Sequence, residues 1–180
     1  MKIIPYEEKY RKDVEDICIE TGSKDNLVNR EHHDFTLLMY CDPYLDHGRC
    51  FVLLDEEERP QGYILCAEDG RQFIKNMEPY FREIREKAPS FAGRCDLREY
   101  EKFVNEYPAH LHIDIRESYT GNGRGSALMN TLLESLQKDK VRGIMVGVGA
   151  DNQRAYHFYQ KMGFHILESD QYGSVLGKKL

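Results

Sequence analysis

The chain has 180 residues, of which 41% are hydrophobic and 31% charged, a composition typical of a soluble globular protein. Its formal net charge of -6 argues against nucleic acid as the main partner and agrees with a cationic substrate. No apolar run approaches the roughly 20 residues of a membrane span, and the first residues lack the apolar core of a signal peptide. We therefore expect a cytoplasmic protein without a membrane partner, in which residues 1–180 form a single domain.

The cysteines exclude two further classes. They are odd in number, widely spaced and without a Cys-x-x-Cys pair, at Cys18, Cys41, Cys50, Cys66 and Cys95. Neither a disulfide framework nor a zinc site has this pattern. We expect buried, reduced thiols and no bound metal.

The first third of the chain predicts a strand, two helices and a hairpin. Apolar residues recur at helical spacing in each helix, and Gly22 ends the first one. The second helix should stop before Asp42-Pro43, because a residue that precedes proline avoids helical angles. The predicted ranges are 2–6 for the strand, 8–20 and 27–40 for the helices, and 50–54 and 62–67 for the hairpin.

Residues 68–108 are predicted as an insertion. Helical spacing runs over residues 73–87, across an unfavourable Glu78-Pro79, and again over residues 99–106. We expect this segment to pack on one edge of the sheet. The alternative is a lid that shapes a substrate pocket.

The most informative stretch is residues 113–126. An alternating apolar strand meets Gly121, Gly123 and Gly125, and a helical pattern follows over residues 127–138. Glycines allow a tight turn and close approach of the backbone to a ligand, and the free N–H groups at a helix start attract anions. A phosphate or pyrophosphate is the expected ligand.

The last part of the chain predicts a strand, a helix and a strand pair. Residues 142–148 form a buried strand, Asn152 is positioned to cap the next helix, and Gly163 to end it. Residues 164–167 and 174–176 are the final strands. The whole order indicates an α/β or α+β layered fold around a mixed sheet.

Familiar phosphate-binding motifs can be compared with residues 121–126. A Walker loop ends in Gly-Lys-Ser/Thr, and no such triplet occurs in the chain. A dinucleotide fingerprint needs a third glycine where Ser126 stands. The glycine pattern by itself is a weak signal, so the ligand must be identified from other residues.

Two separated motifs resemble those of the GNAT superfamily of acyl-CoA N-acetyltransferases. The pyrophosphate turn of that family, Arg/Gln-x-x-Gly-x-Gly/Ala, is similar to residues 120–125, although Thr120 replaces the usual Arg or Gln. Arg124 either supplies the missing positive charge or is a solvated arginine. A later family signature is matched by Asn152, Ala155, Tyr159, Gly163 and Phe164.

The resemblance implies a fold and an activity. The fold would be a mixed, mostly antiparallel sheet of six to seven strands flanked by helices, with the insertion between the third and fourth strands. The activity would be direct transfer of an acetyl group from acetyl-CoA to a primary amine. The implied coenzyme-binding residues are Ile113, Asp114, Ile115, Gly121, Asn122, Gly123, Arg124, Gly125, Ser126, Asn152 and Tyr159.

A narrower resemblance is to the acetyltransferase-like domain attached to animal O-linked N-acetylglucosaminidases and to its stand-alone bacterial relatives. It rests on the predicted hairpin, the start of the insertion and residues 175–178. The animal domain lacks the glycine turn. Since this chain has the turn, coenzyme binding is the stronger expectation here.

The catalytic candidates lie on the strand before the turn and on the last helix. His110, His112 and Asp114 share one strand face at a spacing of two, so each is a candidate for the base that deprotonates the amine. His112 is preferred, Asp114 is second and His110 third, with hydrogen-bonded structural side chains as the alternative. The resemblance implies that Tyr159 protonates the departing thiolate.

Other functions remain open from the sequence. A catalytically inactive acyl-CoA sensor or interaction module is the main alternative, because Thr120 departs from the family pattern. A nucleotide-binding protein of another class is less favoured. The expected acceptor is a small-molecule or peptide amine, and polyamine, aminoglycoside, amino sugar, peptide N-terminus and protein lysine all remain open. The groups that select it should come from the insertion and from the loops near residues 42–47 and 172–173. Relatives commonly form homodimers, so a homodimer is possible.

Overall fold

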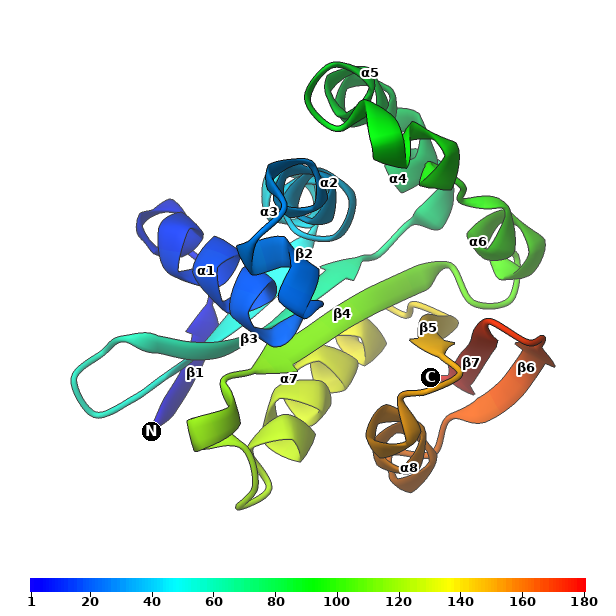
Figure 1. The fold of residues 1–180 in the computed structure, drawn as a ribbon. Coiled ribbons are helices and arrows are strands. Elements are labelled where there is room, and N and C mark those ends of the chain that lie inside the picture. The colour runs from blue at the N-terminus through cyan, green and yellow to red at the C-terminus, as the bar shows by residue number, and fades with distance from the viewer.

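The central feature is a seven-stranded sheet. The structure, a computed structural model, describes the backbone of residues 1–180 and all side chains except that of Glu99. The strand order is β1-β2-β3-β4-β5-β7-β6, and β4 and β5 form its parallel pair (Figure 1). The mostly antiparallel sheet is therefore confirmed. Its strands are β1 (Lys2–Pro5), β2 (Arg49–Leu54), β3 (Pro60–Ala67), β4 (Ala109–Ile115), β5 (Gly143–Gly149), β6 (His165–Ser169) and β7 (Gly173–Lys179).

Helices pack against both faces of this sheet, and each face has its own core. Along β3, Tyr63 and Leu65 join one core, whereas Ile64 and Cys66 join the other. This alternation follows from the period of two of a strand. The helices of the first face are α1 (Arg11–Thr21), α2 (Arg30–Tyr40) and α3 (Asp42–His47). Those of the second core are α7 (Arg124–Lys138) and α8 (Gln153–Lys161).

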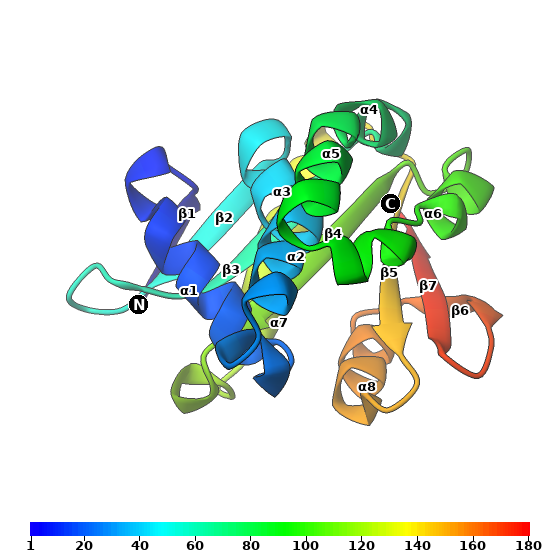
Figure 2. The same ribbon diagram turned by 45° about the horizontal axis from the view of Figure 1, so that its top comes forward.

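The segment between β3 and β4 extends the first helical layer. Figure 2 shows α5 beside α2. The ring of Phe91 stacks on His32 and Phe35, with centroid separations of 4.8 and 5.2 Å. The elements of this segment between β3 and β4 are α4 (Gly70–Asn76), α5 (Glu78–Lys87), the 3-10 helix Pro89–Arg94 and α6 (Arg98–Phe103). Most of this segment therefore packs on helices. One of its side chains, Tyr100, lines a cavity.

Two prolines begin helices where the sequence predicted interruptions. The single helix expected over 73–87 is divided into α4 and α5, with Pro79 in the first turn of α5. The segment 42–47, predicted as a loop, is helix α3 with Pro43 in its first turn, so that prediction was wrong. Proline disrupts the interior of a helix, but its fixed φ and missing N–H suit a first turn. Further short 3-10 helices are Glu8–Tyr10, Lys24–Leu27 and Glu117–Tyr119.

The parallel strands β4 and β5 diverge soon after they meet. Their paired residues are Ala109 with Ile144 and His110 with Met145, yet β4 continues to Ile115 and β5 to Gly149. Figure 2 shows the two strands separating. The edge of β4 that faces β5 is therefore open beyond His110 in the described backbone.

The helices have the short amphipathic character of a globular protein. The buried face of α7 carries Leu128, Leu132 and Leu136 at spacings of four. This pattern anchors the helix that follows the glycine turn. Among the described residues, no helix combines the length and apolar character that crossing a bilayer requires.

Candidate active site

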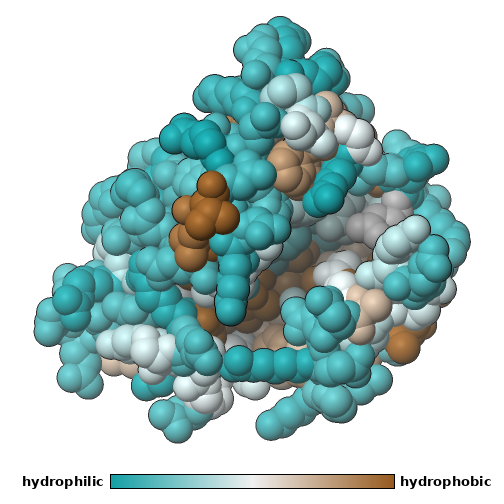
Figure 3. Space-filling view, in the orientation of Figure 1, coloured by the Kyte–Doolittle hydropathy of each residue, from teal (hydrophilic) through white to brown (hydrophobic). Residues whose placement is uncertain are grey.

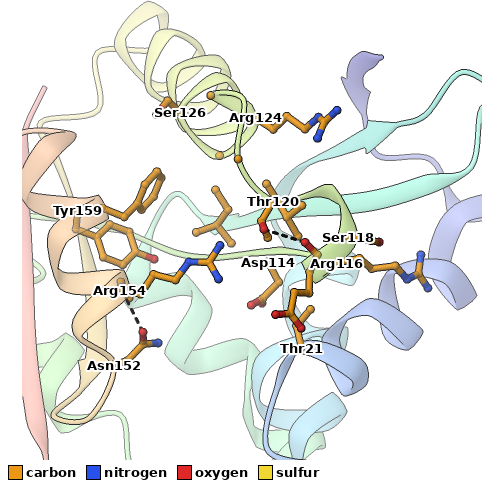
Figure 4. A pocket seen from close by; sticks show the side chains of 18 of the residues that line it. Thr21, Asp114, Arg116, Ser118, Thr120, Arg124, Ser126, Asn152, Arg154 and Tyr159 are labelled. Carbon is orange, nitrogen blue, oxygen red and sulfur yellow. Dashed lines mark hydrogen bonds between the residues drawn. The ribbon is translucent and has the colours of Figure 1, made fainter.

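A cavity of about 870 Å³ opens where β4 leaves β5. It is lined by the end of α1, the second half of β4, the glycine turn with the start of α7, and α8 (Figure 4). These segments are distant in sequence and are brought together by the divergence of the two strands. The cavity therefore lies at the carboxyl end of β4, where open α/β sheets place their ligands.

The glycine turn has a backbone that few residue types adopt. Gly121, Asn122 and Gly123 have φ values of 87°, 50° and 74°, all in the left-handed region. Glycine enters this region freely and asparagine tolerates it. Helix α7 begins directly afterwards, so the N–H groups of Gly125 and Ser126 belong to its first turn and have no acceptor within the helix.

The turn leaves space for an anion. A Cβ atom added at Gly121 or Gly123 would meet no heavy atom within 4 Å, and one at Gly125 would lie 3.4 Å from the ring of Phe158. Gly121 and Gly123 therefore border open volume in the lining of the cavity. The hydroxyl of Thr120 donates to the carbonyl of Glu117 at 2.8 Å, so it stabilises the preceding turn.

Four cationic side chains line the same cavity, but they are held differently. Arg116 donates to Glu20 at 2.7 Å. Arg124 donates to the carbonyl of Tyr119 at 3.0 Å and lies over its ring, and Figure 4 shows it directed away from Tyr159. The guanidinium of Arg154 instead points into the cavity (Figure 4). The fourth cation is Lys161.

Asp114 is the acidic group of β4 in this cavity. The hydroxyl of Tyr63 donates to its carboxylate at 2.6 Å. Burial raises the pKa of Asp114 to about 6, and hydrogen bonds from Tyr63 and Thr21 oppose that rise. A carboxylate with this pKa is ionised at pH 7 and accepts a proton readily.

The two histidines of β4 lie away from this cavity. Burial lowers the pKa of His112 to about 4 and that of His110 to about 3. The Nε2 atom of His112 is 3.1 Å from the hydroxyl of Tyr44, and its ring lines a second cavity. His110 is fully buried, stacked on Tyr100 at 4.3 Å, and neither ring nitrogen has a hydrogen-bond partner among the described side chains. His110 is thus placed as a core residue.

Helix α8 contributes Tyr159 and Asn152. Tyr159 is 5% exposed, and burial followed by the nearby Asp114 charge raises the pKa of its hydroxyl, which therefore stays protonated at pH 7. The side chain of Asn152 accepts from the N–H of Ala155 at 3.0 Å, which confirms the predicted helix cap. Its amide N–H groups are left to face the cavity.

The structure gathers most of the residues predicted to bind the coenzyme. Asn122, which was predicted to bind the coenzyme, and His112, which was predicted as the base, are not in the lining of the 870 Å³ cavity. The predicted residues that do line it are Ile113, Asp114, Ile115, Gly121, Gly123, Arg124, Gly125, Ser126, Asn152 and Tyr159.

Sequence reasoning missed three of the four cations, Arg116, Arg154 and Lys161. Arg154, Phe158 and Lys161 are spaced four and three apart on α8 and line the cavity together. That helical spacing, next to the predicted cap at Asn152, was the available signal. The tertiary structure places the charges of Arg154 and Lys161 in the same cavity as the glycine turn.

No metal centre is indicated in the described part of the chain, where no group of three or more His, Cys, Asp or Glu side chains is placed to hold an ion. The five cysteines are free thiols. Four are buried and Cys95 is partly exposed, so the expectation of buried thiols holds for all but that one.

Comparisons with known proteins agree on one family. The chain is 28% identical over 151 residues to protein O-GlcNAcase of Rattus norvegicus, which covers 73% of this chain and 16% of the rat protein, so the chain spans about one sixth of that relative. The crystal structure of SsHAT superposes with a TM-score of 0.80 at 28% identity, covering 99% of this chain and 97% of that one.

A structure of PaiA N-acetyltransferase from Thermoplasma acidophilum in complex with coenzyme A has a TM-score of 0.63 at 14% identity, with 100% of both chains covered, and shows the shared fold. The sequence profile of the acetyltransferase (GNAT) family matches residues 15–164, which include both predicted motifs and the cavity they line. With the diverging strands and the glycine turn in place, this match shows that the chain belongs to the acetyltransferase (GNAT) family.

Proposed function

We propose that the chain transfers an acetyl group from acetyl-CoA directly to a primary amine while both substrates are bound. The observation that carries this proposal is the junction of an open strand edge with a glycine turn and a helix start at one cavity. Such a junction suits a long ligand with amide groups at one end and phosphates at the other. Acetyl-CoA has this form and supplies an acetyl group as a thioester.

The open edge of β4 would bind the amide-containing arm. Beyond His110, the backbone groups of Ile113 to Ile115 that point toward β5 have no strand partner. An extended ligand can pair with such an edge by main-chain hydrogen bonds, as an added strand does. The amide N–H groups of Asn152 face this ligand from α8.

The glycine turn would bind the diphosphate. Amides of a helix start bind anions without a charged side chain, and the helix dipole adds to this attraction. Gly125 and Ser126 provide two such amides. Arg154 adds a positive charge from the opposite wall of the cavity.

Asp114 is the base that we propose for the amine. A lysine-like amine with a pKa of ~10.4 is neutral about once in a few thousand molecules at pH 7, so removal of its proton is essential. The pKa of about 6 at Asp114 is better matched to this task than the value of about 4 at His112. His112, two residues earlier on the same strand face, would orient the amine.

Tyr159 is the acid that we propose for the departing sulfur. Its protonated hydroxyl lies close enough to Asp114 for that charge to raise its pKa. The two groups therefore provide a base and an acid at one end of the cavity. The rings of Phe158 and Phe164, with centroids 5.3 and 5.4 Å from the Tyr159 ring, fix its orientation.

A non-catalytic acyl-CoA-binding module is the second candidate. The observation in its favour is that the side chain of Thr120, which replaces the usual cation, is engaged with the carbonyl of Glu117. Such a module would bind acetyl-CoA through the turn and would release no thiol. The comparison of Tyr159 variants separates the two functions.

The deciding measurement is release of the CoA thiol with a panel of primary amines. We expect turnover by the unmodified protein and a loss of about 10²-fold or more in kcat for Tyr159→Phe, since a general acid contributes 10²–10⁴-fold. The affinity for acetyl-CoA, measured by calorimetry, should change little because the ring is retained. Tyr10→Phe is the matched control, since Tyr10 is a buried tyrosine outside the cavity lining.

Tight acetyl-CoA binding without turnover of any amine would reject the enzyme and favour the binding module. Loss of acetyl-CoA affinity in Tyr159→Phe would instead assign the hydroxyl to binding. Failure of acetyl-CoA to bind at all would reject both.

A further inference from the structure

A second cavity, of about 420 Å³, lies on the His112 face of β4. The coenzyme cavity is lined by Ile113 and Ile115 of the same strand, which alternate with His112. Asp114, two residues after His112 on the same strand face, also lines the coenzyme cavity, so the two cavities meet along β4 where it diverges from β5. The apolar strand β5 contributes the exposed glycines Gly147 and Gly149, which present backbone without side chains.

Besides β4 and β5, the walls of this second cavity come from α2, α6 and the β6–β7 hairpin. Tyr40 from α2 and Tyr100 from α6 form the helical side, and Tyr100 is the insertion residue that reaches a cavity. The β6–β7 turn forms the far side with Glu168, Asp170 and Tyr172. The volume lies in the range of sites for small molecules rather than of extended peptide grooves.

The two cavities differ in charge. Among the described residues, the second cavity is lined by the carboxylates of Glu168 and Asp170 and by no Lys or Arg. His112 adds no positive charge, because its low pKa keeps it neutral. The coenzyme cavity is lined by four cations, at Arg116, Arg124, Arg154 and Lys161, against three carboxylates, at Glu20, Asp114 and Glu117. A cationic ligand is therefore favoured in the second cavity over the first.

The carboxylates are held in different ways. One oxygen of Asp170 accepts the N–H groups of Tyr172 at 2.7 Å and Gly173 at 3.0 Å, which fixes the carboxylate at the turn. Glu168 is paired with the ammonium of Lys102, and both side chains are about half exposed. A ligand ammonium would compete with Lys102 for Glu168.

The carboxylates are too far from β4 to serve the reacting nitrogen. β5 and β7 lie between β4 and β6 in the sheet, so at roughly 4.8 Å per strand the separation is at least roughly 14 Å, since β4 has already left β5 at His112. The reacting nitrogen must also lose its charge before attack. The carboxylates at the β6–β7 turn would therefore attract a second positive charge of the acceptor rather than its reacting nitrogen. The tyrosine rings of the lining provide faces over which such a cation is stable.

We propose that the second cavity binds the acceptor, and that the acceptor is a small linear amine with at least one further positive charge several methylene groups from the reacting nitrogen. This inference rests on the proposed acetyl transfer, which it deepens by naming the substrate class. The reacting amine lies near His112, and its second ammonium lies at Glu168 and Asp170.

Steady-state assays with matched amines test the proposal. The probes are 1-aminohexane, 1,6-diaminohexane and spermidine, with thiol release as the readout. We expect the KM of the diamine to be roughly 10-fold below that of the monoamine, because exposed ion pairs give a few-fold preference each. Glu168→Gln and Asp170→Asn should each raise the KM of the diamine by a larger factor than the KM of the monoamine, and so remove part of this preference.

Two further variants sharpen the test. Lys102→Gln frees Glu168 from its ion pair, so it should lower the KM of the diamine. Glu86→Gln, an exposed acid on α5 outside the cavity lining, is the control and should have no effect. Equal KM values for monoamine and diamine, or variants at 168 and 170 without effect, would overturn the substrate class while leaving acetyl transfer intact. A lysine peptide used with a higher kcat/KM than every small amine would overturn it as well.

Direct binding keeps the inference separate from catalysis. Calorimetric titration of 1,6-diaminohexane into the protein with CoA needs no turnover. Diamine binding that is weakened by Glu168→Gln and Asp170→Asn would support the cavity assignment even if no amine were acetylated, in which case the proposed transfer would fail alone. Absence of diamine binding at millimolar concentration would reject the inference.

Discussion

At the scale of single residues, burial orders the candidate bases. His110, His112 and Asp114 share one face of β4 as their spacing predicted, but their pKa values differ because their surroundings differ. The pKa values of His110 and His112 are lowered to about 3 and about 4, whereas the pKa of Asp114 is raised to about 6. Removal from water disfavours the charged form of each group, which acts in opposite directions on an acid and a base. Asp114 therefore displaces His112 as the preferred base.

Asp114→Asn tests this assignment through the pH profile. In the unmodified protein, kcat/KM should rise as pH increases through about 6, where the carboxyl ionises. The variant should lose about 10²-fold or more of kcat/KM at pH 7 and lack that rise. Asp25→Asn, on an exposed acid outside the cavity lining, should leave the profile unchanged. A rise near pH 4 that disappears in His112→Ala instead would assign the base to the imidazole.

The same variant has an expected effect on stability, with a definite sign. The folded pKa of Asp114 lies above its ordinary value of 3.8, so ionisation opposes folding. The penalty is absent below pH 3.8, grows between 3.8 and about 6, and is complete above that. Asp114→Asn should raise the free energy of unfolding at pH 7 by up to about 3 kcal/mol and change it little at pH 3.5. Denaturant titrations at both pH values measure the difference.

At the scale of elements, helix α3 and the glycine turn after β4 shape the site. Helix α3, which begins at Asp42-Pro43, carries Tyr44 and so provides the hydroxyl next to His112. A loop there would not hold that ring in place. The glycine turn has the complementary task of holding amides open toward the cavity.

Gly123→Ala tests the turn. Its φ of 74° lies in the left-handed region, where a Cβ atom costs roughly 1–2 kcal/mol, and the added methyl would occupy the open space in front of the amides. We expect acetyl-CoA affinity to fall about 10-fold or more, with stability lowered by roughly that strain. Gly93→Ala is the control, since Gly93 has no positive φ and no atom within 4 Å of the added Cβ. Equal acetyl-CoA affinity in both variants would show that the turn does not contact the coenzyme.

At the scale of the whole molecule, charge is distributed unequally between the two cavities. The chain has a net charge of -6, yet four cationic side chains line the cavity at the glycine turn. An anionic coenzyme is therefore attracted locally by a protein that repels anions overall. The cavity walls strengthen this attraction, because low-dielectric surfaces focus the field of the charges that line them.

Arg154→Ala tests this division of charge. Raising the salt from ~0.05 M to ~0.5 M shortens the Debye length and should weaken acetyl-CoA binding by the unmodified protein. The variant should bind several-fold more weakly at low salt and respond less to added salt. Arg98→Ala removes an exposed guanidinium that is paired with Asp96 outside the cavity, so it should behave as the unmodified protein does. Calorimetry across the salt series measures both slopes, and identical slopes would exclude Arg154 from coenzyme binding.

Local sequence determined the family and the conformation of the glycine turn. The glycines of residues 121–125, the cap at Asn152 and the strand periodicity are short-range signals, because backbone angles and helix starts depend on neighbouring residues. Tertiary structure decided the rest. The pKa order at β4, the convergence of Arg154 and Lys161 on the turn, and the acidic second cavity arise from burial and long-range packing. Desolvation and field strength depend on what surrounds a side chain in space, which spacing along the chain does not specify.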